Sequence, residues 1–135
     1  MLYAIQEASD ALDERLAPLV MEAGLTLPQF RLLWYVVEQG PMRLSELARH
    51  RRCVKSNISN LVRAMEREDL IEVGPAPDDG RARLVRPTRR GRATYTAAAQ
   101  EARRVEEALR TQLGGREARR LERLSLSAAK RLDEM

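Results

Sequence analysis

Residues 44–70 read LSELARHRRCVKSNISNLVRAMEREDL, and the rest of the chain can be arranged around them. The segment is typical of two short helices joined by a tight basic turn. In the second helix the apolar residues follow the i, i+3, i+4, i+7 spacing of one buried face; they are Ile58, Leu61, Val62 and Met65. The spacing predicts a helix-turn-helix whose second helix packs on the core through that face.

The polar residues of this second helix fall on the opposite face. They are Ser56, Asn60, Arg63 and Arg67, with Asn57 and Ser59 at the flank. All six donate hydrogen bonds and all but the arginines also accept them, which suits the base edges and phosphates of DNA. From Leu47 to Met65 five residues are basic and none is acidic. The alternative at this point is a surface helix that is polar and basic without a role in binding.

A basic hairpin is expected directly after this helix. Residues 70–73 and 82–86 are typical of two short strands, and residues 74–80 between them have the composition of a turn. Pro87 is expected to end the second strand. From Arg81 to Arg92 there are six arginines and no acidic residue. Two strands after a helix-turn-helix predict a wing, so helix and hairpin together predict a two-point contact with DNA.

Amphipathic helices are expected at both ends of the chain. Residues 2–20 have an apolar face, Pro18 should kink or restart that helix, and Gly24 should end the segment. Thr88 is the expected cap of a long helix over residues 89–113, which a final helix follows. The apolar faces of these terminal helices would be covered best by a second copy of the chain, which predicts a homodimer.

Between the N-terminal helix and the helix-turn-helix, a further helix is expected to begin at Thr26, an N-cap with Gln29 three residues later. Its apolar face predicts Trp34 in the core rather than exposed as a platform for a ligand. Ser45 is the expected cap of the first helix of the helix-turn-helix.

Composition narrows the class of protein. The chain of 135 residues fits one domain, and its net charge of +4 and pI of about 9.8 favour an anionic partner, nucleic acid before an acidic membrane surface. No apolar run approaches the roughly 20 residues of a membrane span. No signal peptide is recognised, and Cys53 is the only cysteine, so a reducing cytoplasm is the expected location.

Chemistry beyond binding is not expected. The single histidine, His50, belongs to no recognisable catalytic set, so the sequence predicts no enzyme and no cofactor. His50 and Cys53 are only two ligands among arginines that repel a cation, so no metal site is expected. Cys53 has two interpretations. Basic neighbours and a helix N-terminus stabilise a thiolate, as in a redox sensor, whereas a small apolar residue that fills the turn would be inert.

The order of these segments resembles the MarR family of winged helix-turn-helix transcription regulators. The resemblance rests on the stretches LTLPQFRLLWYVVEQGP, LSELARH, CVKSNISNLVRAMEREDLI and PDDGRARLVRPTRRG. The last contains the family's Asp-x-Arg pattern in the wing and its Thr-x-x-Gly pattern at the next helix, here Asp79, Arg81, Thr88 and Gly91. The resemblance implies a mainly α fold with a small β-hairpin wing. It further implies a homodimer on a pseudo-palindromic operator, usually a repressor released by a small ligand or by oxidation.

The resemblance also implies a division of the chain. Residues 1–25 would form an N-terminal dimerisation helix, residues 26–90 the winged helix-turn-helix module, and residues 91–135 the C-terminal dimerisation helices of one intertwined domain. An effector would bind in the cleft between the dimer helices and the module. The residues expected near that cleft are Tyr3, Arg15, Trp34, Tyr35 and Met42.

The polar helix and the wing together supply the residues expected to bind double-stranded DNA. They are Arg51, Arg52, Lys55, Ser56, Asn57, Ser59, Asn60, Arg63, Asp79, Arg81 and Arg83. Within this set the expected readers of bases are Ser56, Asn57, Asn60 and Arg63.

Three positions depart from the family pattern. Ala76 stands where an acidic residue is usual, Pro87 where an aliphatic residue is usual, and the pair Arg51 and Arg52 replaces an apolar residue and a glycine. The arginine pair adds charge at the DNA. The alternative function is an interaction module that keeps the winged fold and uses its basic face for a protein or an anionic surface.

Overall fold

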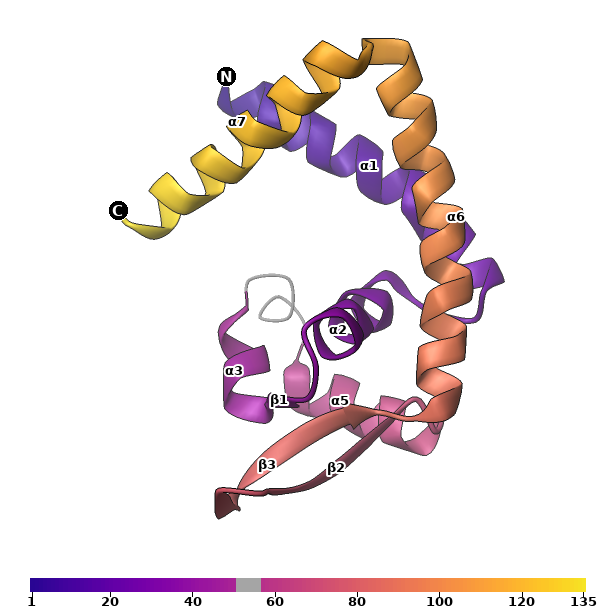
Figure 1. Ribbon diagram of the computed structural model, residues 1–135, viewed down its shortest axis with the longest axis vertical. Coiled ribbons are helices and arrows are strands. Elements are labelled where there is room, and N and C mark those ends of the chain that lie inside the picture. Colours follow the sequence, from indigo (N-terminus) through magenta and orange to yellow (C-terminus); the bar gives the residue numbers. More distant parts are fainter. Residues whose placement is uncertain (51–56) are drawn as a thin grey trace. The chain divides into compact units, whose positions relative to one another are not determined.

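The computed structural model describes residues 1–50 and 57–135. The elements are, in order, α1 (Leu2–Glu22), α2 (Leu27–Glu38), β1 (Met42–Arg43), α3 (Leu44–Arg49), α5 (Ile58–Arg67), β2 (Ile71–Ala76), β3 (Asp79–Pro87), α6 (Arg89–Leu113) and α7 (Gly115–Asp133). The chain divides into two compact units, Met1–Ala102 and Arg103–Met135, and α6 continues from the first into the second (Figure 1). The mainly helical fold with a small antiparallel sheet confirms the predicted fold class.

The sheet has three strands in the order β1-β3-β2, so the predicted hairpin gains a third strand that the sequence did not indicate. The predicted turn over residues 74–80 is too long. β2 continues to Ala76 and β3 begins at Asp79, so only residues 77 and 78 connect the strands. Gly74 and Pro75 pair with β3 instead of leaving it, and β2 is an edge strand, where a proline is tolerated.

One apolar core joins the helices and the sheet of the first unit. Its fully buried side chains include Val20, Leu25, Leu32, Leu33, Val36, Leu47, Met65 and Val85. Trp34 packs against this core but stays half-buried, so the prediction of a core residue is met only in part. Tyr35, the next residue, is the buried one.

Most of the predicted helix ends are confirmed. The Thr26 side chain accepts a hydrogen bond from Gln29 N, and the Gln29 side chain accepts one from Thr26 N, which completes a capping box. Gly24 lies in the left-handed region with φ of +95°, and Leu25 N donates to Val20 O at 2.9 Å, as in a glycine-terminated helix.

One expected helix cap is wrong, and one of the two effects expected of Pro18 is absent. Ser45 does not cap α3, because the chain enters the helix directly from β1 and Arg43 occupies the N-cap position. Pro18 does not restart α1, which is one helix from Leu2 to Glu22. Proline removes a single backbone hydrogen bond, and Val20 is fully buried two residues later, so packing can hold the last turn in place.

The start of α6 lies against Leu70, which follows α5 and precedes β2. Thr88 Oγ1 accepts from Gly91 N at 2.9 Å, confirming Thr88 as the cap, and Thr88 N donates to Leu70 O at 3.1 Å. A Cβ on Gly91 would lie 2.0 Å from Leu70 O, so only glycine allows this approach. The Thr-x-x-Gly pattern therefore has a steric cause in this chain.

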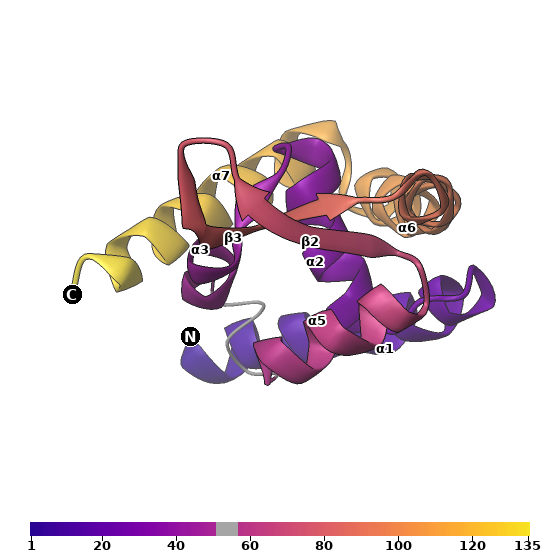
Figure 2. The same ribbon diagram turned by 90° about the horizontal axis from the view of Figure 1, so that it is seen from below.

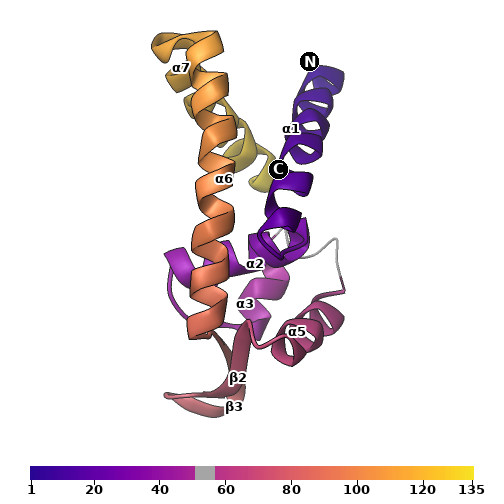
Figure 3. The same ribbon diagram turned by 90° about the vertical axis from the view of Figure 1, so that its right-hand side faces the viewer.

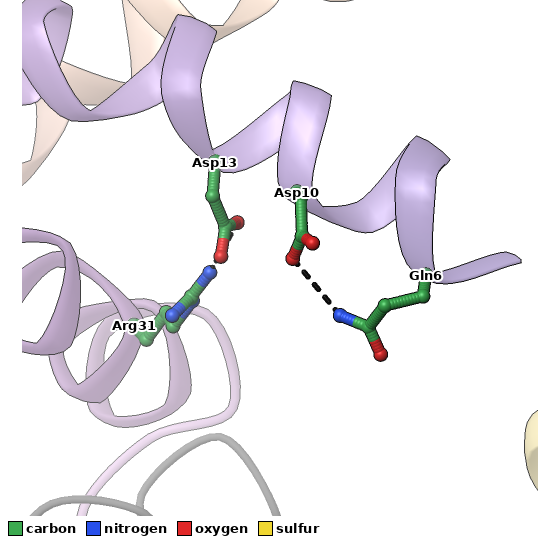
Figure 4. A network of polar contacts seen from close by, with 4 residues as sticks. All are labelled: Gln6, Asp10, Asp13 and Arg31. Atoms are coloured by element: carbon green, nitrogen blue, oxygen red, sulfur yellow. Dashed lines mark hydrogen bonds and ion pairs between the residues drawn. The ribbon is translucent and has the colours of Figure 1, made fainter. Parts of the chain in front are cut away.

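α1 is joined to α2 by an ion pair. Arg31 Nη2 lies 2.6 Å from Asp13 Oδ1, and one turn closer to the N-terminus of α1 Gln6 Nε2 donates to Asp10 Oδ1 at 2.9 Å (Figure 4). The side of α1 that carries this network is therefore turned toward α2, and the large apolar residues at its N-terminus, Leu2, Tyr3 and Ile5, stay exposed.

Candidate DNA-binding surface

α5 has the apolar and polar faces that its spacing predicts. Val62 and Met65 are buried and Ile58 and Leu61 are half-buried, which anchors the helix on the core. The residues predicted on the opposite face are exposed, namely Asn57, Ser59, Asn60, Arg63 and Arg67. The helix therefore presents amide, hydroxyl and guanidinium groups on one side.

Asn57 has a structural role in α5 in addition to its predicted contact with DNA. It is the N-cap of α5, and its Oδ1 accepts a hydrogen bond from Asn60 N at 3.4 Å. Asn57 was predicted only as a DNA contact, so the cap is a further role of this residue. With the oxygen used in the helix, the side-chain N–H groups are the part of Asn57 that can donate to DNA.

The C-terminal end of α5 is held from two sides. Asp69 adopts the left-handed conformation with φ of +59°, and Leu70 N donates back to Met65 O at 2.9 Å, so the chain leaves the helix through a closed turn. Glu68 Oε2 accepts a hydrogen bond from Gln29 Nε2 at 2.9 Å. Gln29 thus caps α2 and ties it to α5, a second role that no local sequence signal could reveal.

The wing, which consists of β2 and β3, lies at the same end of the first unit as α5 (Figures 1 and 3). Its residues 79–83 carry the predicted arginines and are called the arm below. Asp79, Arg81 and Arg83 are all exposed. Asp79 Oδ1 accepts a hydrogen bond from Arg81 N at 3.0 Å. This Asx-type turn fixes the backbone from which the Arg81 side chain departs.

A second acidic residue of the wing, not singled out from the sequence, also has a defined contact. Asp78 Oδ2 lies 2.6 Å from Arg43 Nη2, so the connection between β2 and β3 is joined to β1. The arginine run continues past the wing into α6, where Arg89, Arg90 and Arg92 are exposed. Polar helix, arginine arm and further exposed arginines thus belong to one compact unit.

Part of the predicted site lies outside the described residues. These positions are Arg51, Arg52, Cys53, Lys55 and Ser56. His50, the last described residue before them, is the C-cap of α3, and its ring stacks on Tyr35 with a centroid distance of 4.1 Å. That packing gives His50 a structural role at the end of α3.

Over residues 1–50 and 57–135, no group of three or more His, Cys, Asp or Glu side chains is arranged to hold a metal ion. Within the same ranges no helix is long and apolar enough to cross a membrane. A cavity of about 460 Å³ opens in the first unit where α1, α2, α5 and α6 meet. Its wall is apolar at Met21, Leu25 and Leu70 and polar at Gln29, Glu68 and Arg90.

Parts of the sequence are similar to a known protein family and to a known repressor. The profile of the MarR family matches residues 25–82, which covers the start of α2 through the wing. The HTH-type transcriptional repressor IacR of Pseudomonas putida is 34% identical over 73 residues, which are 54% of this chain and 44% of that protein. The chain thus spans less than half the length of that relative.

The fold was compared with solved structures. The transcriptional repressor CouR bound to a 23-mer DNA duplex superposes with a TM-score of 0.85 at 25% identity, covering 96% of this chain and 92% of that one. NadR in complex with 4-hydroxyphenylacetate superposes with a TM-score of 0.81 at 21% identity, covering 95% and 91%. The likeness to both extends over almost the whole chain.

Proposed function

We propose that this chain is a MarR-family transcription regulator that binds DNA and acts as a repressor on a pseudo-palindromic operator, because the profile of that family matches residues 25–82. It is a regulator rather than an enzyme. The observation that carries the proposal is the exposed polar face of α5 beside an arginine wing whose backbone is fixed by Asp79. Helix and wing can meet DNA together because both belong to one compact unit.

We infer from the chemistry of each surface which groove of DNA α5 and the wing would contact. α5 would enter the major groove, where Arg63 can donate two hydrogen bonds to a guanine edge and Asn60 can donate one to an adenine edge and accept one from it. The wing arm would follow the minor groove, whose negative potential attracts arginine. IacR is named as a repressor and CouR is a repressor seen on DNA, which supports repression as the mode of action.

The regulator is proposed to work as a cytoplasmic homodimer. α7 has no buried residue in the single chain, and Leu121, Leu124 and Leu132 on its predicted face are each about half exposed. A second copy would cover such faces and would place two reading helices about one turn of DNA apart, roughly 34 Å.

Release by a small molecule is the regulatory part of the proposal. NadR is seen with 4-hydroxyphenylacetate, and this chain has a cavity whose wall includes Glu68, the C-cap of α5, and Leu70, whose N donates to Met65 O of that helix. A molecule bound there would act on the end of the reading helix. Compounds that raise the melting temperature of the protein and also release the operator would identify the effector.

Selection of bound sequences from a random DNA pool tests the function. The expected result is a two-fold symmetric consensus with half-sites about one helical turn apart. A salt titration on random-sequence DNA separates the alternative, since an interaction module with a basic face would bind DNA weakly and without register. Enrichment of no consensus would overturn the proposal of a sequence-specific regulator.

A further inference from the structure

The tip of the wing is joined to the helix-turn-helix by a contact across 35 residues of sequence. Asp78 lies in the two-residue connection of the β hairpin, and its Oδ2 is 2.6 Å from Arg43 Nη2. Arg43 is the last residue of β1 and the N-cap position of α3. The contact therefore runs from the part of the wing nearest Arg81 to the point where the helix-turn-helix begins.

The contact supports a tip at which the pairing of the strands is irregular. β1 pairs with β3 only at two positions, and Arg43 stands opposite Leu84. Between β2 and β3 the register shifts, so that Pro75 pairs with Arg83 but Ala76 pairs with Asp79. The residues 80–82, which include Arg81, therefore stand outside the ladder. Figures 1 and 2 show this end of the hairpin on the side of α3.

We propose that Arg43 and Asp78 are a positioning pair that holds the tip of the wing against the helix-turn-helix and so sets where Arg81 meets DNA relative to α5. The inference rests on the proposed DNA-binding function. A tip without this contact would sample many positions, and ordering it at the DNA would cost conformational entropy. Pairing also neutralises the negative charge of Asp78 at a surface that approaches phosphates.

The exposure of Arg43 and Asp78 indicates whether the ion pair affects the stability of the protein or the position of the wing. The Asp78 side chain is 72% exposed and that of Arg43 is 33% exposed. Exposed ion pairs contribute little to the free energy of unfolding. The pair should therefore act on the mobility of the tip and on DNA affinity, while the melting temperature of the protein stays nearly constant.

Asp78→Asn tests the proposal because charge and position predict opposite results. The substitution removes a negative charge beside the DNA, so electrostatics alone predicts tighter binding. Loss of the positioning pair predicts binding about 2- to 10-fold weaker at fixed salt, the equivalent of ordering one or two side chains. Asp78→Glu keeps a carboxylate within reach of Arg43 and should restore most of the affinity.

Glu72→Gln is the matched control, since Glu72 is exposed on β2 and its replacement removes the same charge from the same hairpin. This control should bind as tightly as the parent or about twofold tighter. The double variant Arg43→Ala with Asp78→Ala should bind no more weakly than Arg43→Ala alone, because the second change then has no pair to break. Tighter binding of Asp78→Asn, or additive losses in the double variant, would overturn the inference.

A measurement without DNA separates this inference from the proposed function. Hydrogen exchange at the amides of residues 80–82 should be faster in Asp78→Asn than in the parent and unchanged in Glu72→Gln. Equal exchange in the parent and Asp78→Asn would overturn the positioning pair whatever the protein binds. If exchange is faster in Asp78→Asn but the parent protein selects no DNA sequence, the positioning pair stands and the proposed regulator is overturned.

Discussion

At the scale of single residues, Asp79 offers a test in which geometry and charge disagree. Its Oδ1 accepts from Arg81 N at 3.0 Å, so Asp79→Ala should release the backbone of the arm. Ordering a loose arginine costs up to about 2 kcal/mol, so operator affinity should fall although the protein becomes more positive. The loss should be greatest on operators with A·T-rich flanks, where the narrow minor groove attracts arginine. Tighter binding at fixed salt would show that Asp79 does not organise the wing.

Substitutions in α5 and substitutions of residues that contact phosphates should change DNA binding in different ways. The first should change the preference for particular bases, and the second should change the affinity for all sequences. Asn60→Ala and Arg63→Ala remove groups from the exposed face of α5, and each should relax base preference at particular positions by about 1–3 kcal/mol. Lys55→Ala should weaken all sequences alike and lower the salt slope by about one unit. Affinity measured on a panel of single-base variants of the operator distinguishes these outcomes. Parent-like profiles for both α5 variants would mean that this helix does not read the bases.

The burial and exposure of side chains within one helix could be predicted from the sequence, but contacts between residues far apart in the chain could not. The buried Val62 and Met65 and the exposed Asn60 and Arg63 follow from helical spacing alone. The contact between Arg43 and Asp78 depends on how the hairpin folds back, which no spacing encodes. Asn57 lies between these cases, because its cap could be read locally but its place at the flank of the polar face was interpreted only as a DNA contact.

At the scale of elements, the sequence predicts helix ends well where a side chain closes the end. Thr88 placed the start of α6, and the element runs over Arg89–Leu113 as expected. The hairpin was harder because Gly74 and Pro75 have turn composition but lie in an edge strand, where cross-strand pairing outweighs local preference. β1 has two residues, too few for any period to indicate it.

The junction between α5, β2 and α6 should tolerate no side chain at residue 91. Gly91→Ala would place a Cβ 2.0 Å from Leu70 O, and the opposing atom is backbone, so the strand or the helix must move. We expect a loss of about 3 kcal/mol or more in the free energy of unfolding, at the upper end of overpacking costs. Denaturant unfolding measures the loss. Gly74→Ala is the control, since nothing lies within 4 Å of its added Cβ. Equal stability of the two variants would contradict the steric role of Gly91.

At the scale of the whole molecule, the apolar surface left by one chain exceeds what the winged module can cover. In the second unit Leu109, Leu113, Leu121, Leu124, Leu126 and Leu132 are exposed, and in α1 Leu2, Ile5 and Leu12 are exposed. Burying one leucine is worth about 1.5–3 kcal/mol, so several together could hold two chains at micromolar concentration. The borders predicted at residues 25 and 90 separate dimer helices from the DNA-binding module, and they stay predictions until the dimer is tested.

Leu121→Asp and Leu124→Asp test the dimer at the face of α7 that the helical spacing predicts to be shared. Each would bury an unpaired carboxylate at the interface, which costs several kcal/mol or forces the chains apart. Sedimentation at micromolar concentration should therefore give a dimer for the parent and mainly monomer for both variants. Ser127→Asp adds the same charge off that face and should leave the dimer intact.

The monomers should also bind a full operator far more weakly than the dimer, because two half-sites must then be filled separately. A parent that sediments as a monomer would contradict the dimer. Dissociation by Ser127→Asp as well would mean that the shared face of α7 lies elsewhere on the helix.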